Sequence, residues 1–109
     1  MSWIKQFFGE VSHVWGATKR SPGWDRLRDA HIDKNPFCAG CAIPFKLEAH
    51  HIAPFHLHPE LELEPTNLIT LCRDCHWFLG HMRDWSLFNP HVIEDAAIYR
   101  ERFIAARLK

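Results

Sequence analysis

Two pairs of cysteines, each pair separated by two residues, are the feature that most constrains this chain. The pairs are Cys38/Cys41 and Cys72/Cys75. Four thiolates at these spacings suit a tetrahedral structural zinc ion, because each Cys-x-x-Cys turn supplies two ligands. In a reducing compartment such cysteines bind a metal more readily than they form disulfides. The sequence therefore predicts a fold in which the two cysteine pairs meet around one zinc ion.

Length and charge limit the size of the fold and the source of any nucleic-acid binding. A chain of 109 residues supports one domain, and a domain this small gains appreciably from a metal staple. Lys+Arg and Asp+Glu both number 13, so binding to nucleic acid must come from local clusters of positive charge. Between the two cysteine pairs Lys46 is the only Lys or Arg, so we expect phosphate contacts mainly from the flanking segments.

No secretory signal or membrane span is visible in the sequence. The apolar residues near the N-terminus are interrupted by Lys5, Gln6 and Glu10, and no apolar run approaches the length that crosses a bilayer. The sequence predicts a cytoplasmic protein with no membrane partner.

The hydrophobic pattern divides the chain into an extension and one compact domain. Apolar residues at spacings of three and four over 2–15 indicate a helical face, so residues 1–20 are expected to form an N-terminal helical extension. Residues 21–109 form the main domain. Within it, the pattern predicts a helix, two strands and two further helices, over residues 24–33, 45–52, 68–71, 74–82 and 89–106. Asn89 and Pro90 are read as the N-cap and first residue of the last helix.

Histidines and one asparagine fall close to the cysteine pairs. His50 and His51 end the first predicted strand, Asn67 precedes the second, and His76 follows Cys75 directly. Paired imidazoles with a third one suit a hard or borderline metal ion and a general base. The spacing thus predicts a second centre, chemically distinct from the four thiolates.

The ordered set of residues resembles a known family. His50-His51-Ile52-Ala53-Pro54, followed by Asn67-Leu68-Ile69-Thr70-Leu71-Cys72 and Cys75-His76, resembles the His-Asn-His (HNH) endonucleases. Residues 24–31 and 78–81, with Asn89-Pro90, are similar to small HNH nucleases of tailed phages and prophages. The resemblance implies an α+β fold with a small ββα-metal core, flanking helices and a structural zinc.

The resemblance also implies an activity and roles for single residues. The chain would be a metal-dependent endonuclease that hydrolyses phosphodiester bonds in DNA, by nicking, double-strand cutting or both. His51 would be the general base, and His50 and His76 would bind a catalytic Mn²⁺ or Mg²⁺ ion, with other divalent metals open. Asn67 would brace the loop after the first strand and so orient the His51 ring.

His81 departs from the family pattern. Several relatives carry a further histidine ligand four residues after the last motif histidine, but Gly80 occupies that position here and His81 follows it. One residue corresponds to about 100° around an α-helix, so helical periodicity argues against His81 as a ligand. His81 either replaces that ligand through a distorted helix end or has another role.

Partners and DNA contacts are less closely defined by the sequence. Four arginines are candidates for phosphate contacts, with surface ion pairs as the alternative reading: Arg73, Arg83, Arg26 and Arg28. The resemblance suggests phage genome packaging beside a terminase, as a monomer or a dimer. The alternative function is a non-catalytic zinc-ribbon module that binds DNA, which would need the cysteines and basic flanks but not the histidines.

Overall fold

The structure, a computed structural model, describes residues 20–108. The predicted N-terminal helical extension therefore lies outside the described residues, apart from Arg20. The main chain runs from helix α2 (Trp24–Lys34) through strand β1 (Leu47–His51) and strand β2 (Leu68–Cys72) to helix α3 (Arg73–Cys75). A π-helical turn, η3 (His76–Gly80), continues α3, and helix α4 (Val92–Arg107) ends the chain. Within residues 20–108 no helix has the length and apolar character needed to cross a membrane.

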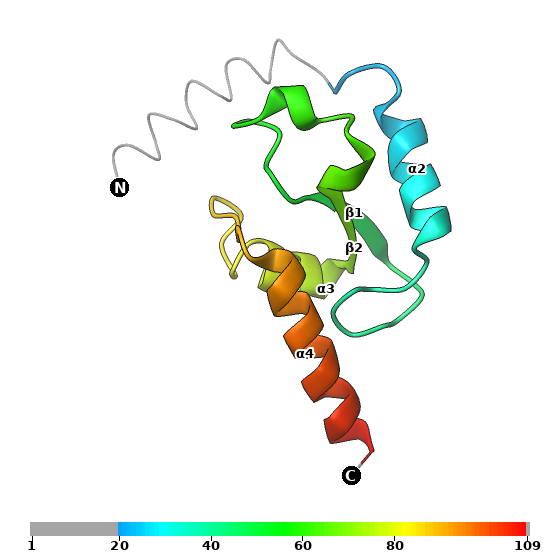
Figure 1. The fold of residues 1–109 in the computed structure, drawn as a ribbon, viewed down its shortest axis with the longest axis vertical. Coiled ribbons are helices and arrows are strands. Elements are labelled where there is room, and N and C mark those ends of the chain that lie inside the picture. The colour runs from blue at the N-terminus through cyan, green and yellow to red at the C-terminus, as the bar shows by residue number, and fades with distance from the viewer. Residues whose placement is uncertain (1–19, 109) are drawn as a thin grey trace.

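The two strands form an antiparallel sheet whose faces are covered by different elements. Leu47 pairs with Cys72, and His51 pairs with Leu68 at the other end of the ladder. Helix α2 packs on β1 and β2, while α3 and η3 contact the strands from another side. Helix α4 contacts η3 and extends away from the body of the domain (Figure 1). The small α+β fold with a two-stranded antiparallel sheet, expected from the sequence, is confirmed.

The buried core is centred on the cysteines. Three of the four cysteines are buried, together with apolar residues from β2, η3 and α4: Leu71, Leu79, Val92 and Ala96. A sheet of only two strands provides little interior of its own, so packing around the cysteines joins the strands to α4. Residues 38–41 therefore belong to the core although they form no helix or strand.

Long connections fill the space between the regular elements. Between β1 and β2 the chain makes two short 3₁₀ turns, η1 (Pro59–Leu61) and η2 (Pro65–Asn67). This connection carries Glu62, whose side chain is almost completely buried.

Two sequence-based helix predictions were wrong in detail. The helix expected over 74–82 is a short α3 continued by η3, and it ends where Met82 and Arg83 adopt positive φ angles of 52° and 66°. The last helix begins at Val92 and not at Asn89. The Asn89 side chain donates to the Leu79 carbonyl and to Asp95, so it ties η3 to α4 across the helix start.

Candidate active site and metal centres

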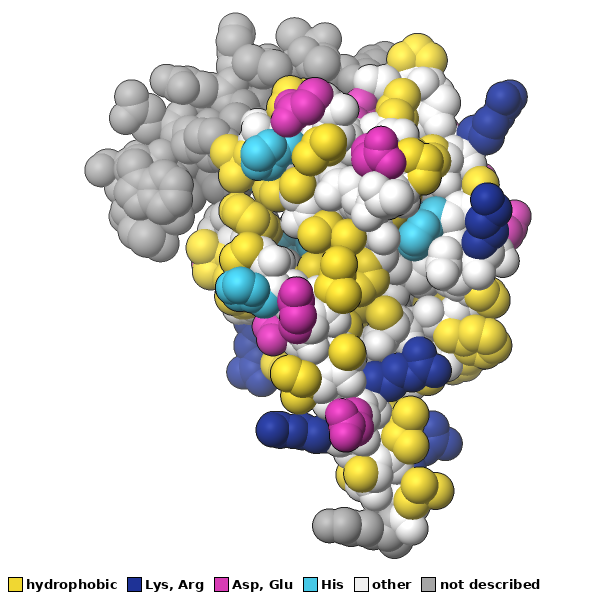
Figure 2. Space-filling model, viewed as in Figure 1, with side chains coloured by type: hydrophobic (Ala, Val, Ile, Leu, Met, Phe, Trp, Pro, Cys, Tyr) yellow, Lys and Arg dark blue, Asp and Glu magenta, His cyan; other side chains and the backbone are white. Residues whose placement is uncertain are grey.

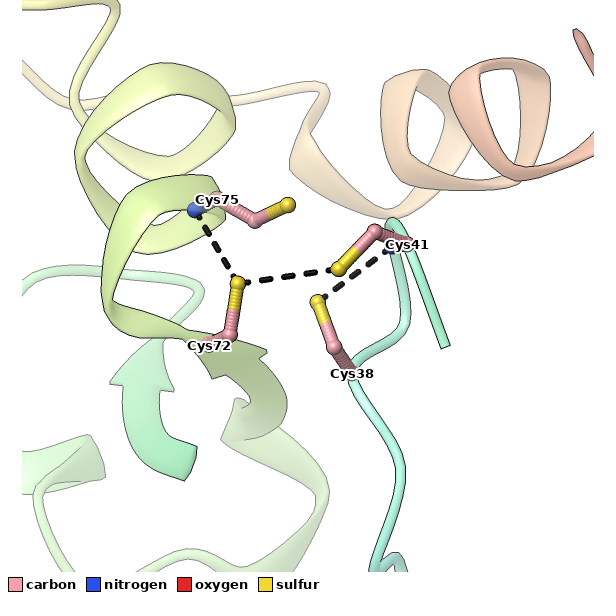
Figure 3. A group of neighbouring side chains, drawn as sticks. All are labelled: Cys38, Cys41, Cys72 and Cys75. Atoms are coloured by element: carbon pink, nitrogen blue, oxygen red, sulfur yellow. Dashed lines mark hydrogen bonds between the residues drawn. The ribbon is translucent and has the colours of Figure 1, made fainter. Parts of the chain in front are cut away.

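The four cysteine side chains converge on one point. Cys38 and Cys41 come from a loop, Cys72 from the end of β2 and Cys75 from α3, and all four side chains point toward one another (Figure 3). The four sulfur atoms lie within 4.8 Å of one another, and the Cys41 and Cys72 sulfurs are 3.7 Å apart. Tetrahedral zinc with Zn–S bonds of about 2.3 Å requires sulfurs about 3.8 Å apart. The cluster therefore fits a zinc ion.

The sulfur atoms of Cys38 and Cys72 accept hydrogen bonds within this cluster. The backbone N–H groups of Gly40 and Cys41 donate to the Cys38 sulfur at 3.3 and 3.4 Å, and the Cys75 N–H donates to the Cys72 sulfur at 3.4 Å. The Cys75 thiol also donates to the Cys38 sulfur, which lowers the pKa of Cys38 to about 4 and raises the pKa of Cys75. Thiolate is the form that ligates metal, so these bonds favour the ligating state of Cys38.

The sheet explains why two consecutive histidines have different surroundings. Successive residues of a strand point to opposite faces, so His50 and His51 leave β1 on different sides. The His50 ring lies against η3 and within 4.9 and 5.0 Å of the His76 and His81 ring centroids. The His51 ring instead stacks on Trp24 of α2. Strand geometry therefore separates a histidine cluster from a single histidine, although both border one cleft.

His50 is held in its neutral form inside the domain. It is 4% exposed, and burial lowers its pKa to about 3, with a further contribution from the neighbouring histidines. Its Nε2 atom is buried and has no hydrogen-bond partner among residues 20–108. A buried polar atom without a hydrogen-bond partner lowers the stability of the fold, so a ligand bound to this nitrogen would recover stability.

His76 and His81 complete the cluster, and in each ring the Nδ1 atom is hydrogen-bonded to another group. His76 Nδ1–H donates to the Glu48 carboxylate at 2.9 Å, and His81 Nδ1–H donates to the Leu87 carbonyl at 2.6 Å. In the neutral rings each Nε2 then carries a lone pair, and these two atoms face each other at 3.3 Å. Nitrogens about 2.1 Å from one tetrahedral metal would be about 3.4 Å apart. Facing lone pairs, fixed by carboxylate and carbonyl partners, are the arrangement expected around a metal ion.

The π-helical turn brings His81 to this cluster. In η3 the His81 N–H bonds to the His76 carbonyl at 3.1 Å, which is a step of five residues and not four. The widened turn puts His81 beside His76, where an α-helix would have put residue 80. The donor atoms of His50, His76 and His81 lie within 4.8 Å of one another. Of the two readings left open by the sequence, this geometry favours His81 as the replacement ligand.

Gly80 provides the space that the histidine cluster needs. A Cβ atom at this position would lie 3.0 Å from His50 Cε1, 3.1 Å from His50 Nδ1 and 3.2 Å from His76 Cδ2. Both rings would have to shift by a few tenths of an ångström to make room for this atom, which would change the positions of their donor nitrogens.

Gly80→Ala is therefore expected to weaken metal binding at the histidine cluster. Displaced or misoriented ligands typically cost about tenfold to hundredfold in metal affinity. Titration calorimetry with Mn²⁺ on the zinc-loaded protein measures this loss, and the zinc content of the same sample serves as the internal control. Unchanged Mn²⁺ affinity in Gly80→Ala would show that the space beside Gly80 has no part in metal binding.

The surroundings of His51 favour its neutral form. It is 7% exposed, its ring stacks on Trp24 with centroids 4.6 Å apart, and its Nε2–H donates to the Glu62 carbonyl at 2.9 Å. Burial lowers its pKa, although the bond to the Glu62 carbonyl acts in the opposite direction. The neutral ring therefore has its proton on Nε2 and a lone pair on Nδ1, which is the form that accepts a proton.

Asn67 braces the connection that follows β1. Its Oδ1 accepts from the Ala53 N–H at 2.8 Å, and its Nδ2 donates to the carbonyls of Ala53 and Leu61 at 3.0 and 3.2 Å. Leu61 precedes Glu62, whose carbonyl holds His51. A short path of hydrogen bonds and backbone therefore connects Asn67 to the His51 ring, which it does not contact directly.

A cleft of about 220 Å³ joins the two sets of histidines. Its lining combines the histidine cluster with His51 and with aromatic and basic side chains: Arg20, Phe55, His56 and Trp85. A larger hollow of about 440 Å³ lies between η3 and α4, and its lining includes Phe78, Met82 and Tyr99 but none of the histidines. We place the candidate site in the smaller cleft because the reactive groups are there.

The arginines expected to contact DNA lie outside this cleft. Arg28 is paired with Asp25 and Asp29 at 3.2 and 3.1 Å, which matches the alternative reading of a surface ion pair. Arg26, Arg73 and Arg83 are exposed, and Arg83 lies over the Phe78 ring. In the space-filling view, Lys and Arg side chains flank the region of α4 on both sides (Figure 2).

Arg20 is a cleft residue that the sequence did not reveal. Its guanidinium lies 4.8 Å from the ring centroids of both Trp24 and Phe55 and 3.9 Å from the Glu62 carboxylate. Arg20 lies four residues before Trp24, a spacing that places two residues side by side only within a helix. The turn at Ser21-Pro22-Gly23 separates them, so the spacing gave no prediction. Its pKa is lowered by burial, against the effect of Glu62.

Comparison with known proteins identifies the central part of the chain. Residues 38–78 match the family described as HNH endonuclease. This segment begins at the first cysteine of the cluster and includes β1, β2, α3 and part of η3. No match was found among curated proteins or among solved structures.

Proposed function

We propose that this chain, whose residues 38–78 form an HNH endonuclease domain, is a metal-dependent endonuclease that hydrolyses phosphodiester bonds in DNA. The single observation that carries the proposal is that a cluster of three histidines and a separate fourth histidine border the same cleft. The three imidazoles of His50, His76 and His81 converge on one point, and His51, whose pKa is lowered by burial, borders the same cleft. A nuclease of this class needs a cation site and a separate base at close range.

His51 acts as the general base in this proposal. Its Nε2–H is bound to the Glu62 carbonyl, so Nδ1 is the nitrogen that takes a proton from the attacking water. Burial keeps the ring neutral before the reaction. The proton would rest on His51 while the phosphodiester bond breaks, and the products would carry 5′-phosphate and 3′-hydroxyl ends. Asn67 contributes by bracing the loop that holds the ring.

The histidine cluster would hold the catalytic cation. When bound, a divalent cation there neutralises charge that develops on the phosphate oxygens and on the leaving oxygen. Glu48 and the Leu87 carbonyl fix the tautomers of His76 and His81, so both rings offer Nε2. Three imidazole donors favour Mn²⁺ or a later transition metal over Mg²⁺, which prefers oxygen ligands.

The cysteine cluster has a separate role as a structural zinc site. A zinc ion with four protein ligands has no open coordination position for a substrate, so it stabilises the fold and takes no part in hydrolysis. Cys75 and His76 are adjacent, and thus the zinc site fixes the start of the segment that carries two of the three histidines.

DNA is the partner that this proposal requires, and HNH domains bind DNA. The basic side chains around α4 and the exposed Arg26, Arg73 and Arg83 are candidates for backbone contacts, which give little sequence preference. A terminase partner, and dimer formation to cut both strands, stay predictions.

Metal-dependent plasmid cleavage tests the proposal against the alternative of a non-catalytic DNA-binding module. We expect nicking of supercoiled DNA with Mn²⁺, weaker nicking with Mg²⁺ and none after brief EDTA treatment that leaves zinc in the cysteine cluster. The zinc content of each sample separates loss of the catalytic cation from unfolding. Cutting that persists with excess EDTA would contradict the mechanism, and binding without cutting under every condition would favour the module.

A further inference from the structure

The ring of His51 lies at one end of a stack of side chains. Trp24, the first residue of α2, covers the ring at a centroid distance of 4.6 Å and an interplanar angle of 25°. On Trp24 lies the guanidinium of Arg20, which also lies over Phe55, at 4.8 Å from each centroid. Trp24 is 9% exposed and lies outside the segment that matches the family.

The same end of α2 is tied to the loop that holds His51. The buried Glu62 carboxylate accepts hydrogen bonds from the Ser21 N–H and from the Ser21 hydroxyl, and it pairs with Arg20 at 3.9 Å. The carbonyl of the same Glu62 accepts the His51 Nε2–H. One residue therefore fixes both the His51 ring and the turn that carries Trp24.

A single hydrogen bond is not sufficient to orient an imidazole. The bond from Nε2–H to the Glu62 carbonyl fixes one atom of the ring, but the ring plane is still free to turn about its broad second side-chain torsion. A flat aromatic surface at stacking distance limits that rotation, because tilting the ring would lose contact with Trp24. The hydrogen bond and the stack together define the direction of the Nδ1 lone pair.

We propose that Trp24 is a positioning residue for His51, held in place by Glu62 through the Ser21 turn. This inference rests on the proposed role of His51 as the general base. It assigns a catalytic contribution to α2, whose Trp24 acts through the His51 ring and does not itself line the cleft.

The test compares Trp24→Leu with Trp24→Phe. Leucine keeps apolar bulk but provides no flat surface, whereas phenylalanine restores a ring. We expect Trp24→Leu to lower kcat for plasmid nicking about tenfold to hundredfold, the range in which misplacement of a reacting group typically acts. KM and Mn²⁺ content should stay near those of the parent, and Trp24→Phe should recover most of the rate.

Loss of stability needs its own control, because Trp24 is buried. Tyr99→Leu removes a partly buried aromatic ring from α4, where Tyr99 packs on Phe78 and Phe103 and does not line the cleft. Both leucine variants should melt at a lower temperature, but only Trp24→Leu should lose kcat when assayed where both are folded. Because the Glu62 carbonyl accepts the His51 Nε2–H, we expect a sharp NMR signal from this proton in the parent and a broadened one in Trp24→Leu alone.

His51→Ala in the same assay separates two kinds of failure. If His51→Ala is inactive while Trp24→Leu has the parent's kcat, the positioning role is wrong and the proposed function stands. If His51→Ala cuts as fast as the parent, the proposed base itself is wrong. An equal fall in kcat for Trp24→Leu and Tyr99→Leu would also overturn the positioning role, because it would trace the loss to stability.

Discussion

Replacing Cys38 or Cys72 by alanine is expected to unfold the domain. The cysteines form the centre of the buried core, and their cluster joins the loop at 38–41 to β2 and α3. Structural zinc contributes roughly 10–16 kcal/mol of apparent binding free energy, which equals or exceeds the roughly 5–15 kcal/mol of stability expected of a domain. A zinc site with one ligand missing would lose much of that contribution.

Circular dichroism and zinc analysis measure this effect together. Cys38→Ala should show little helical signal, no cooperative thermal transition and less than one zinc ion per chain. His51→Ala is the control, since it removes a side chain that lies outside the cysteine cluster, and it should keep the helical signal, a cooperative transition and the zinc ion. A Cys38→Ala protein that is folded, free of zinc and active in nicking DNA would refute the assignment of the cluster.

The cysteine cluster and the two strands were predictable because local spacing encodes them. A Cys-x-x-Cys turn brings its two sulfurs together whatever surrounds it, and two such turns can share one ion. The strands predicted over 45–52 and 68–71 correspond to β1 and β2, and the position of His50 and His51 at a strand end followed from them. These signals lie within a few residues of one another.

The position of His81 was not predictable by the same reasoning. An α-helical step of about 100° per residue sets residue 81 off the face of His76, but the chain widens by one residue in η3. The π turn is stabilised by distant partners, since Asn89 binds the Leu79 carbonyl and His81 binds the Leu87 carbonyl. Such contacts depend on the folded loop at 81–91 and leave no periodic pattern in the sequence.

The surroundings of His51 were hidden for a related reason. Trp24 and Glu62 reach the ring from positions 27 and 11 residues away, through a stack and a backbone carbonyl that no local motif specifies. Neither Trp24 nor Glu62 belongs to a sequence motif that links it to His51. Only the folded chain brings them to the base.

Replacing His51 by alanine is expected to remove nearly all DNA cleavage. A positioned general base typically contributes on the order of a hundred- to ten-thousandfold to a reaction rate. His51 borders the cleft with its proton held on Nε2 by Glu62, and it is absent from the cluster formed by His50, His76 and His81. The variant should therefore keep its metal ions and its fold while losing the group that accepts the proton.

The most direct test is the nicking rate of supercoiled plasmid by the parent and by His51→Ala at saturating Mn²⁺. Both proteins are matched for zinc and manganese content and are assayed at a temperature at which both are folded. The parent should cut at least about a hundredfold faster than the variant, in keeping with the loss of a general base. Equal rates from the two metal-matched proteins would contradict the central claim that a neutral His51, beside a cation held by three histidines, activates the attacking water.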